Sequence, residues 1–216
     1  MTDQSTVYPP SRDTYVLLGA VTDVEGRRFL DLGCGNGLVG AYAAAMGADV
    51  VCADVNPDAV AHASARAEDM GVVVTGLVSD LFGRVEGLFD VITFNPPYLP
   101  TSRLNLKGPC ATCQWPSWEE GPARTFRCRS PKWLAYDGGR KGRELTDRFI
   151  EGVGRHLAPE GRALLIAIAD NDVPDLLRTA SGRGLTGKIV DECEAPDETL
   201  FLVELRHKKR RFWQRA

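Results

Sequence analysis

Residues 31–37 read Asp-Leu-Gly-Cys-Gly-Asn-Gly, and this stretch decides the fold that we predict for the 216-residue chain. It stands between a short apolar run at residues 28–32 and a run of small residues with helical character at 38–46. A strand, a glycine turn and a helix in this order form the first unit of a sheet with crossover helices. Glycines in such a turn adopt positive φ and let the backbone approach a ligand, while the helix N-terminus presents free N–H groups.

Apolar runs and helical patterns continue to alternate along the chain, which predicts an α/β fold in a single domain over residues 1–216. A turn at residues 195–197 separates the final two runs, so we expect a mostly parallel seven-stranded sheet with an antiparallel last strand and helices on both faces. The predicted strands cover residues 28–32, 49–55, 72–78, 89–94, 162–169, 186–194 and 198–206, and the predicted helices cover residues 11–24, 38–46, 56–71, 143–157 and 173–183.

The composition excludes a membrane protein and disfavours a general nucleic-acid binder. Charged residues make up 25% of the chain, and no apolar run approaches the roughly 18 residues that cross a bilayer. The start of the chain has no basic flank before an apolar stretch, so we predict no signal peptide, a cytoplasmic location and reduced cysteines. The net charge of −3 carries no sign of the broad basic surface that nucleic acids need.

Acidic side chains lie at or just after the ends of the first three predicted strands. Asp31 precedes the glycine loop, Asp54 ends the second strand and Asp80 follows the third. A carboxylate before the loop disfavours a phosphate group and suits a cationic amino group, whereas a carboxylate after the second strand can hold two ribose hydroxyls. An amino acid joined to a nucleoside has both features, and S-adenosylmethionine fits that description.

The same loops contain the other residues that we expect to bind this cofactor. Gly33 and Gly35 alternate with larger residues, unlike the Gly-x-Gly-x-x-Gly pattern of dinucleotide sites. Val55 and Leu81 follow the second and third strands, where an adenine can lie between apolar side chains near Asp80. A tight turn without any ligand is the alternative interpretation of the glycine loop.

The tetrapeptide Asn95-Pro96-Pro97-Tyr98 follows the fourth predicted strand and should border the same crevice. Two prolines fix φ and remove donors, which leaves the Asn95 side chain and the Pro96 carbonyl as rigidly placed acceptors. Two neighbouring acceptors match an –NH₂ group, and Tyr98 offers a flat face to a planar amide or base. We predict that these four residues form the catalytic motif and act by positioning and electrostatic preorganisation.

The motifs together resemble the Asn-Pro-Pro-Tyr class of S-adenosylmethionine-dependent N-methyltransferases, and more narrowly the HemK-type protein-glutamine methyltransferases of the short branch. The resemblance covers nearly the whole chain and implies a Rossmann-like class I methyltransferase fold. Its motifs are Tyr8-x-Pro10-x-x-Asp13-Thr14, residues 31–37, Asp54, Asp80-Leu81, the tetrapeptide, and Gly138-Gly139-Arg140-Lys141-Gly142-Arg143.

The resemblance also implies roles for residues that composition and spacing do not assign. Tyr8, Asp13 and Thr14 would close over the cofactor, and we expect Arg140 to guide the substrate backbone. The implied substrate is the glutamine of the Gly-Gly-Gln motif in a translation release factor. The short branch often works with a small zinc-binding activator subunit, and residues 72–74 would lie on an apolar edge strand that invites such a partner. An edge that is adequately buried without a partner is the alternative.

A segment of about forty residues, 99–139, departs from the family pattern. Cys110 and Cys113 have the spacing of a zinc half-site and Cys128 is a third candidate ligand, but the segment has no fourth cysteine or histidine. A zinc site and a lid with reduced cysteines as small apolar residues therefore both stay open.

We predict an S-adenosylmethionine-dependent N-methyltransferase whose acceptor is a glutamine side-chain amide of a release factor. Asn95, Tyr98 and Arg140 are the predicted substrate-binding residues. The alternatives are N-methylation of an RNA or DNA base, N-methylation of a small molecule, and a binding scaffold with no catalysis. Base methylation in a duplex requires base extrusion, for which this chain shows no recognition domain.

Overall fold

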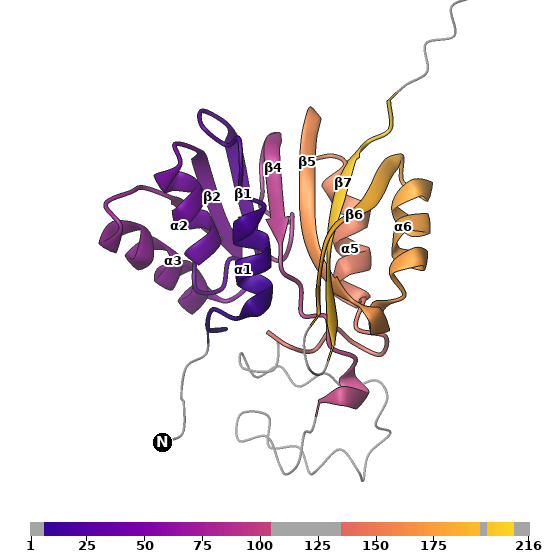
Figure 1. Ribbon diagram of the computed structural model, residues 1–216. Helices are drawn as coiled ribbons and strands as arrows, with labels where there is room; N and C mark the ends of the chain where they lie inside the picture. The colour runs from indigo at the N-terminus through magenta and orange to yellow at the C-terminus, as the bar shows by residue number, and fades with distance from the viewer. Residues whose placement is uncertain (1–6, 105–134, 195–197, 210–216) are drawn as a thin grey trace, which may run out of the picture.

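The computed structural model describes residues 7–104, 135–194 and 198–209. They form three layers, a central sheet with helices on both of its faces (Figure 1). The strands are β1 (Arg28–Leu32), β2 (Asp49–Asp54), β3 (Thr75–Val78), β4 (Phe89–Phe94), β5 (Leu157–Ile168), β6 (Leu185–Glu194) and β7 (Thr199–His207). The helices are α1 (Arg12–Gly19), α2 (Leu38–Ala45), α3 (Pro57–Asp69), α5 (Glu144–Val153) and α6 (Val173–Gly182), with 3₁₀ turns at η1 (Thr101–Arg103) and η2 (Ala169–Asn171).

Over the described residues the sheet has seven strands in the order β3-β2-β1-β4-β5-β7-β6. Strands β3, β2, β1, β4 and β5 run parallel, and β7 lies antiparallel between β5 and β6. The predicted Rossmann-like sheet with an antiparallel last strand is confirmed. The strand order reverses between β1 and β4, where Leu32 pairs with Phe94. This register places the glycine loop beside the tetrapeptide at the point where open α/β sheets bind ligands.

Buried apolar side chains form one cluster on each side of the sheet in the described part of the chain. Alternation along β1 directs Phe29 toward α1, α2 and α3, and directs Leu30 and Leu32 toward α5 and α6. Phe149 of α5 stacks on Phe94 with ring centroids 4.8 Å apart. This contact fixes the end of β4, from which the tetrapeptide leaves the sheet.

Several predicted element bounds are wrong, and for the first helix the reason is that apolar residues continue past its end. The first helix ends at Gly19 rather than residue 24, although Val21 and Val24 are buried in the turns that follow. Within that helix Leu17 is buried and Tyr15 is 58% exposed, so the helix packs on the sheet through the face that carries Leu17. Helix α5 ends at Val153, and β5 begins earlier than predicted.

The predicted strand at residues 72–78 is also too long. Pairing with β2 begins at Thr75, so the valine run at 72–74 precedes the edge strand instead of lying in it. The edge position itself is as predicted, because β3 is the outermost strand on this side of the sheet.

The Gly37→Ala substitution should strongly destabilise the fold. Gly37 has φ +74°, and a Cβ there would overlap the backbone of Ala63 in α3. Backbone strain together with this overlap should lower the free energy of unfolding by about 2 to 5 kcal/mol, measured by denaturant unfolding. Gly71→Ala is the matched control, because Gly71 has φ +69° with nothing within 4 Å of the added carbon. Its free energy of unfolding should fall only by the cost of backbone strain, about 1 to 2 kcal/mol. Equal losses in the two variants would contradict the role of the Ala63 contact.

Candidate active site

The glycine loop after β1 curls over the end of β2. Gly33 and Gly35 have φ of +66° and +50°, and the N–H groups of Gly33 and Cys34 both donate to the Ala53 carbonyl oxygen at 2.7 and 3.1 Å. A Cβ on Gly33 would come within 3.3 Å of the Phe94 ring. The loop therefore forms a cradle in which the backbone itself faces the space above the sheet.

One buried and one partly buried carboxylate are tied to this loop. Asp31 accepts from the Thr93 hydroxyl at 2.9 Å and from the Gly40 N–H at 3.0 Å. Burial nevertheless raises its pKa to about 7, because desolvation outweighs those two hydrogen bonds. Asp54 accepts from the Gly35 N–H at 3.0 Å, and burial also raises its pKa.

The third predicted carboxylate has a different environment. Asp80 follows β3 and its side chain is mostly exposed. It accepts from Arg148 of α5 at 2.9 Å, in an ion pair that spans the mouth of the crevice. Because the pair is exposed, it contributes little to stability and can exchange for another partner.

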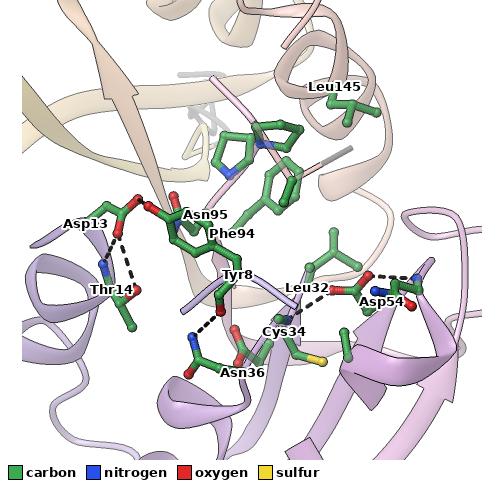
Figure 2. A pocket seen from close by; sticks show the side chains of 18 of the residues that line it. Tyr8, Asp13, Thr14, Leu32, Cys34, Asn36, Asp54, Phe94, Asn95 and Leu145 are labelled. Carbon is green, nitrogen blue, oxygen red and sulfur yellow. Dashed lines mark hydrogen bonds between the residues drawn. The ribbon is translucent and has the colours of Figure 1, made fainter. Parts of the chain in front are cut away.

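The tetrapeptide holds a polar atom whose hydrogen-bonding capacity is unused. The Asn95 Oδ1 atom is buried, and within the described ranges it has no hydrogen-bond partner. A buried acceptor without a partner costs free energy, and such exceptions in native proteins call for an explanation such as a ligand. Figure 2 shows Asn95 among the side chains that line the pocket, together with Phe94 and Tyr8.

Asn171 supports the backbone that follows the tetrapeptide. Its side chain is buried, donates to the Tyr98 carbonyl oxygen at 2.8 Å and to the Gly142 carbonyl oxygen at 3.2 Å, and accepts from the Ile168 N–H at 2.9 Å. Gly142 has φ +69°, and a side chain on it would overlap the Tyr98 carbonyl. The predicted family segment 138–143 therefore packs directly behind the tetrapeptide.

The segment before α1 closes the crevice from the other side. The Asn36 side chain of the glycine loop donates to the Tyr8 carbonyl oxygen at 3.0 Å (Figure 2). The Tyr8 ring meets the Tyr136 ring edge to face with centroids 5.2 Å apart. The two ends of the inserted segment also meet, since the Leu99 carbonyl oxygen accepts from the Gly138 N–H at 2.9 Å.

These elements enclose a cavity of about 490 Å³, a size that suits a nucleoside-sized ligand. The structure brings together all predicted cofactor-binding residues and all four residues of the tetrapeptide on its wall. The predicted residues that line it are Tyr8, Asp13, Thr14, Asp31, Gly33, Gly35, Asp54, Val55, Asp80, Leu81, Asn95, Pro96, Pro97 and Tyr98. Arg140 is exposed and is not among the lining residues, so its substrate role stays a prediction.

Sequence reasoning missed several residues of this wall. Asn36, Tyr136, Leu145, Arg148 and Glu198 line the cavity, and Asn171 supports it from behind. Leu145 and Arg148 lie three positions apart in α5, a helical spacing that places both on one face. That spacing, next to the segment 138–143, was the available signal for these two residues.

The metal prediction falls outside the described residues, because Cys110, Cys113 and Cys128 lie between residues 105 and 134. In the ranges that the structure does describe, no group of three or more His, Cys, Asp or Glu side chains could hold a metal ion. The same ranges contain no helix that is long and apolar enough to span a membrane.

Comparison with known proteins identifies the family. Residues 11–107 match the family model described as the methyltransferase small domain. The human methyltransferase HEMK2 is 32% identical over 212 residues, which cover 93% of this chain and 89% of HEMK2. The chain belongs to the HemK family of methyltransferases. The release factor glutamine methyltransferase of Chlamydia trachomatis is 27% identical over 82% of this chain and 56% of its own length.

A solved structure has a fold similar to that of this HemK-family chain. The E. cuniculi Mtq2–Trm112 complex, described as responsible for methylation of the eRF1 translation termination factor, has a TM-score of 0.66. The match covers 94% of this chain and 100% of that chain at 24% identity. This likeness supports the Rossmann-like methyltransferase fold.

The methyl donor of this HemK-family enzyme is S-adenosylmethionine. The site's donors and acceptors fit that molecule. A buried carboxylate stands before an open glycine cradle, a second carboxylate ends β2, and exposed Val55 lies beside them on the cavity wall. An amino group, ribose hydroxyls and an adenine each have a matching partner in this set.

Proposed function

We propose that this protein methylates the glutamine side-chain amide of a translation release factor. The Asn95 side chain carries the proposal, because Asn95 lines the cavity and its Oδ1 atom has no hydrogen-bond partner within the described ranges. An amide –NH₂ supplies such a donor and is also a planar, weakly nucleophilic nitrogen. The names of the relatives support the amide, since one is a release factor glutamine methyltransferase and the Mtq2 structure is described with eRF1.

The cofactor half of the cavity would be organised by the three carboxylates. Asp31 would hold the amino group, Asp54 the ribose hydroxyls and Asp80 the adenine edge, with Val55 and Leu81 on the adenine faces. Tyr8 and Thr14 would close this half from the N-terminal side. When bound, S-adenosylmethionine supplies an electrophilic methyl group on a positively charged sulfur.

The acceptor half would work by orientation. Asn95 Oδ1 and the Pro96 carbonyl oxygen would each accept one N–H of the substrate amide, which fixes its plane and directs the nitrogen lone pair. Pro96 and Pro97 keep both acceptors in place at no further entropic cost. Tyr98 would lie along one face of the amide, and we retain Arg140 as a contact to the substrate backbone outside the cavity.

A labelling experiment tests the substrate. The purified protein, with and without a Trm112-type subunit, is incubated with labelled S-adenosylmethionine, a release factor and total RNA. We expect one methyl group on the glutamine of the Gly-Gly-Gln motif, located by mass spectrometry. A release factor whose glutamine is Ala is the control and should stay unlabelled. Label on RNA with none on protein would reassign the enzyme to base methylation.

We also propose that the open side of β3 binds a small zinc-binding activator subunit. Strand β3 is outermost in the sheet, and an exposed edge can accept an added strand. Val73 is 86% exposed just before it and Val78 at its end is also exposed, so the edge has an apolar border. Mtq2 was solved in complex with Trm112, which supports a subunit of this kind here. We place both proteins in the cytoplasm, where release factors act.

The Val73→Asp substitution should weaken this association. The substitution removes apolar area that binding would bury and introduces a charge that binding must desolvate. We therefore expect about a tenfold or greater loss of affinity in a binding assay with a Trm112-type subunit. Val190→Asp is the matched control on β6, the opposite edge strand, where Val190 is 41% exposed. It should bind like the wild type. Equal weakening in the two variants would argue against β3 as the contact.

A further inference from the structure

Asp13 receives hydrogen bonds from three separate parts of the active site. It lies in the first turn of α1 and is 2% exposed. Its Oδ2 atom accepts from the Tyr8 hydroxyl at 2.9 Å and from the Tyr98 hydroxyl at 3.0 Å, although Tyr98 lies 85 positions further along the chain. Its Oδ1 atom accepts from the Thr14 N–H at 2.7 Å (Figure 2).

Both phenols stay protonated, so both hydrogen bonds to Asp13 persist at physiological pH. Burial is the main cause that raises the pKa of Tyr8 and of Tyr98 above the ordinary value, and the Asp13 charge raises both further. Hydrogen bonds to a charged acceptor are about twice as strong as neutral ones. The carboxylate therefore joins the two rings firmly.

The two phenols belong to different halves of the cavity. Tyr8 is docked on the glycine loop through the Asn36 side chain, as described above. Tyr98 ends the tetrapeptide, and its carbonyl oxygen is held by Asn171 at 2.8 Å. The Tyr98 backbone is thus fixed by Asn171 and its ring by Asp13, which together determine the direction of the ring plane.

We propose that Asp13 is a positioning residue for the methyl acceptor, in addition to any contribution to cofactor binding. It acts through Tyr98, whose ring orientation it sets, and it links that ring to Tyr8 above the glycine loop. The proposal rests on the proposed function, because Tyr98 faces the acceptor in that reaction. It assigns to α1 a part in catalysis that the cofactor site alone does not require.

The expected kinetics separate the two halves. Tyr98→Phe should lower kcat about tenfold and leave the Kd for S-adenosylmethionine within about twofold, because only the acceptor half loses its anchor. Tyr8→Phe should raise that Kd with less effect on kcat. Asp13→Ala should do both. Tyr15→Phe is the matched control, since Tyr15 is an exposed tyrosine of the same helix, and it should change neither quantity.

A double-mutant cycle tests the link between Asp13 and Tyr98. In the Asp13→Ala background, Tyr98→Phe should have little further effect on kcat, because the bond that it removes is already absent. Multiplicative losses in the double variant would overturn the proposal, as would an Asp13→Ala enzyme with normal kcat. If Asp13→Ala does not fold, Asp13→Leu keeps a side chain of similar size without a hydrogen-bond acceptor and serves in the same cycle.

An acceptor-free measurement distinguishes this proposal from the proposed function. The same cycle on unfolding equilibrium constants should show a coupling of about tenfold between positions 13 and 98. A wild type that leaves the release factor unlabelled, with this coupling present, would refute the substrate and leave the positioning bond standing. A wild type that labels the release factor, with no coupling in either cycle, would refute the role of Asp13 alone.

Discussion

The Asn95→Ala substitution should lower kcat by about 10²- to 10³-fold, which is the range for loss of one preorganised polar contact to reacting atoms. The Asn95 Oδ1 atom is buried, and in the described structure it has no partner, so under the proposed mechanism it accepts from the substrate amide. Without it, one amide N–H of the acceptor loses its partner and the nitrogen lone pair is free to rotate away from the methyl group. We expect the loss in kcat more than in the Kd for S-adenosylmethionine.

Asn95→Asp is the matched comparison, because it keeps an acceptor oxygen at the same place. It should retain more activity than Asn95→Ala by at least about tenfold, consistent with an acceptor role. Thermal unfolding controls for the fold, and both variants should melt close to the wild type. An Asn95→Ala enzyme with undiminished kcat on its methyl acceptor would refute the orientation mechanism.

The central strands of the sheet were predictable because they are mostly buried and read as continuous apolar runs, whereas the edge strands β3 and β6 are largely exposed. Residues 89–94 were predicted with the bounds that β4 has. The ends of helices were not, because burial and helicity are different properties. Val21 and Val24 extend the apolar pattern of α1, yet Asp23 between them has φ +53° and interrupts any helix.

The three carboxylates of the cofactor half were predictable from position alone, whereas Tyr8, Asp13 and Thr14 were assigned only through the family resemblance. Asp31, Asp54 and Asp80 follow consecutive parallel strands, and such strand ends meet at one edge of a sheet. Asn171 could not be found this way, because its partners are backbone carbonyls of Tyr98 and Gly142, which leave no pattern in side-chain types. Contacts of this kind depend on how loops meet.

The Asp31→Asn substitution should abolish the pH dependence of S-adenosylmethionine binding near neutrality. In the ligand-free protein, burial raises the Asp31 pKa to about 7, and the nearby Asp54 charge adds to that shift. Below pH 7 the carboxyl is protonated and offers a cationic amino group no charge. Affinity in the wild type should therefore increase about tenfold per pH unit well below 7 and level off above it, measured by calorimetry from pH 5.5 to 8.

In Asp31→Asn the affinity should be nearly independent of pH over that range, and at pH 8 about 10- to 100-fold weaker than in the wild type. Asp49→Asn, which removes an exposed acid of β2, is the control and should keep the wild-type profile. The stability of the cofactor-free protein should change with pH in the opposite direction to its affinity for S-adenosylmethionine. Because the Asp31 pKa is raised in the folded protein, the unfolded chain binds fewer protons between about pH 4 and 7, so the free energy of unfolding of the wild type falls as pH rises through that range. Without cofactor, Asp31→Asn does not show this fall in the free energy of unfolding, so its melting temperature at pH 8 should be higher than that of the wild type. A variant that binds S-adenosylmethionine as tightly as the wild type at pH 8 would exclude Asp31 as the partner of the amino group.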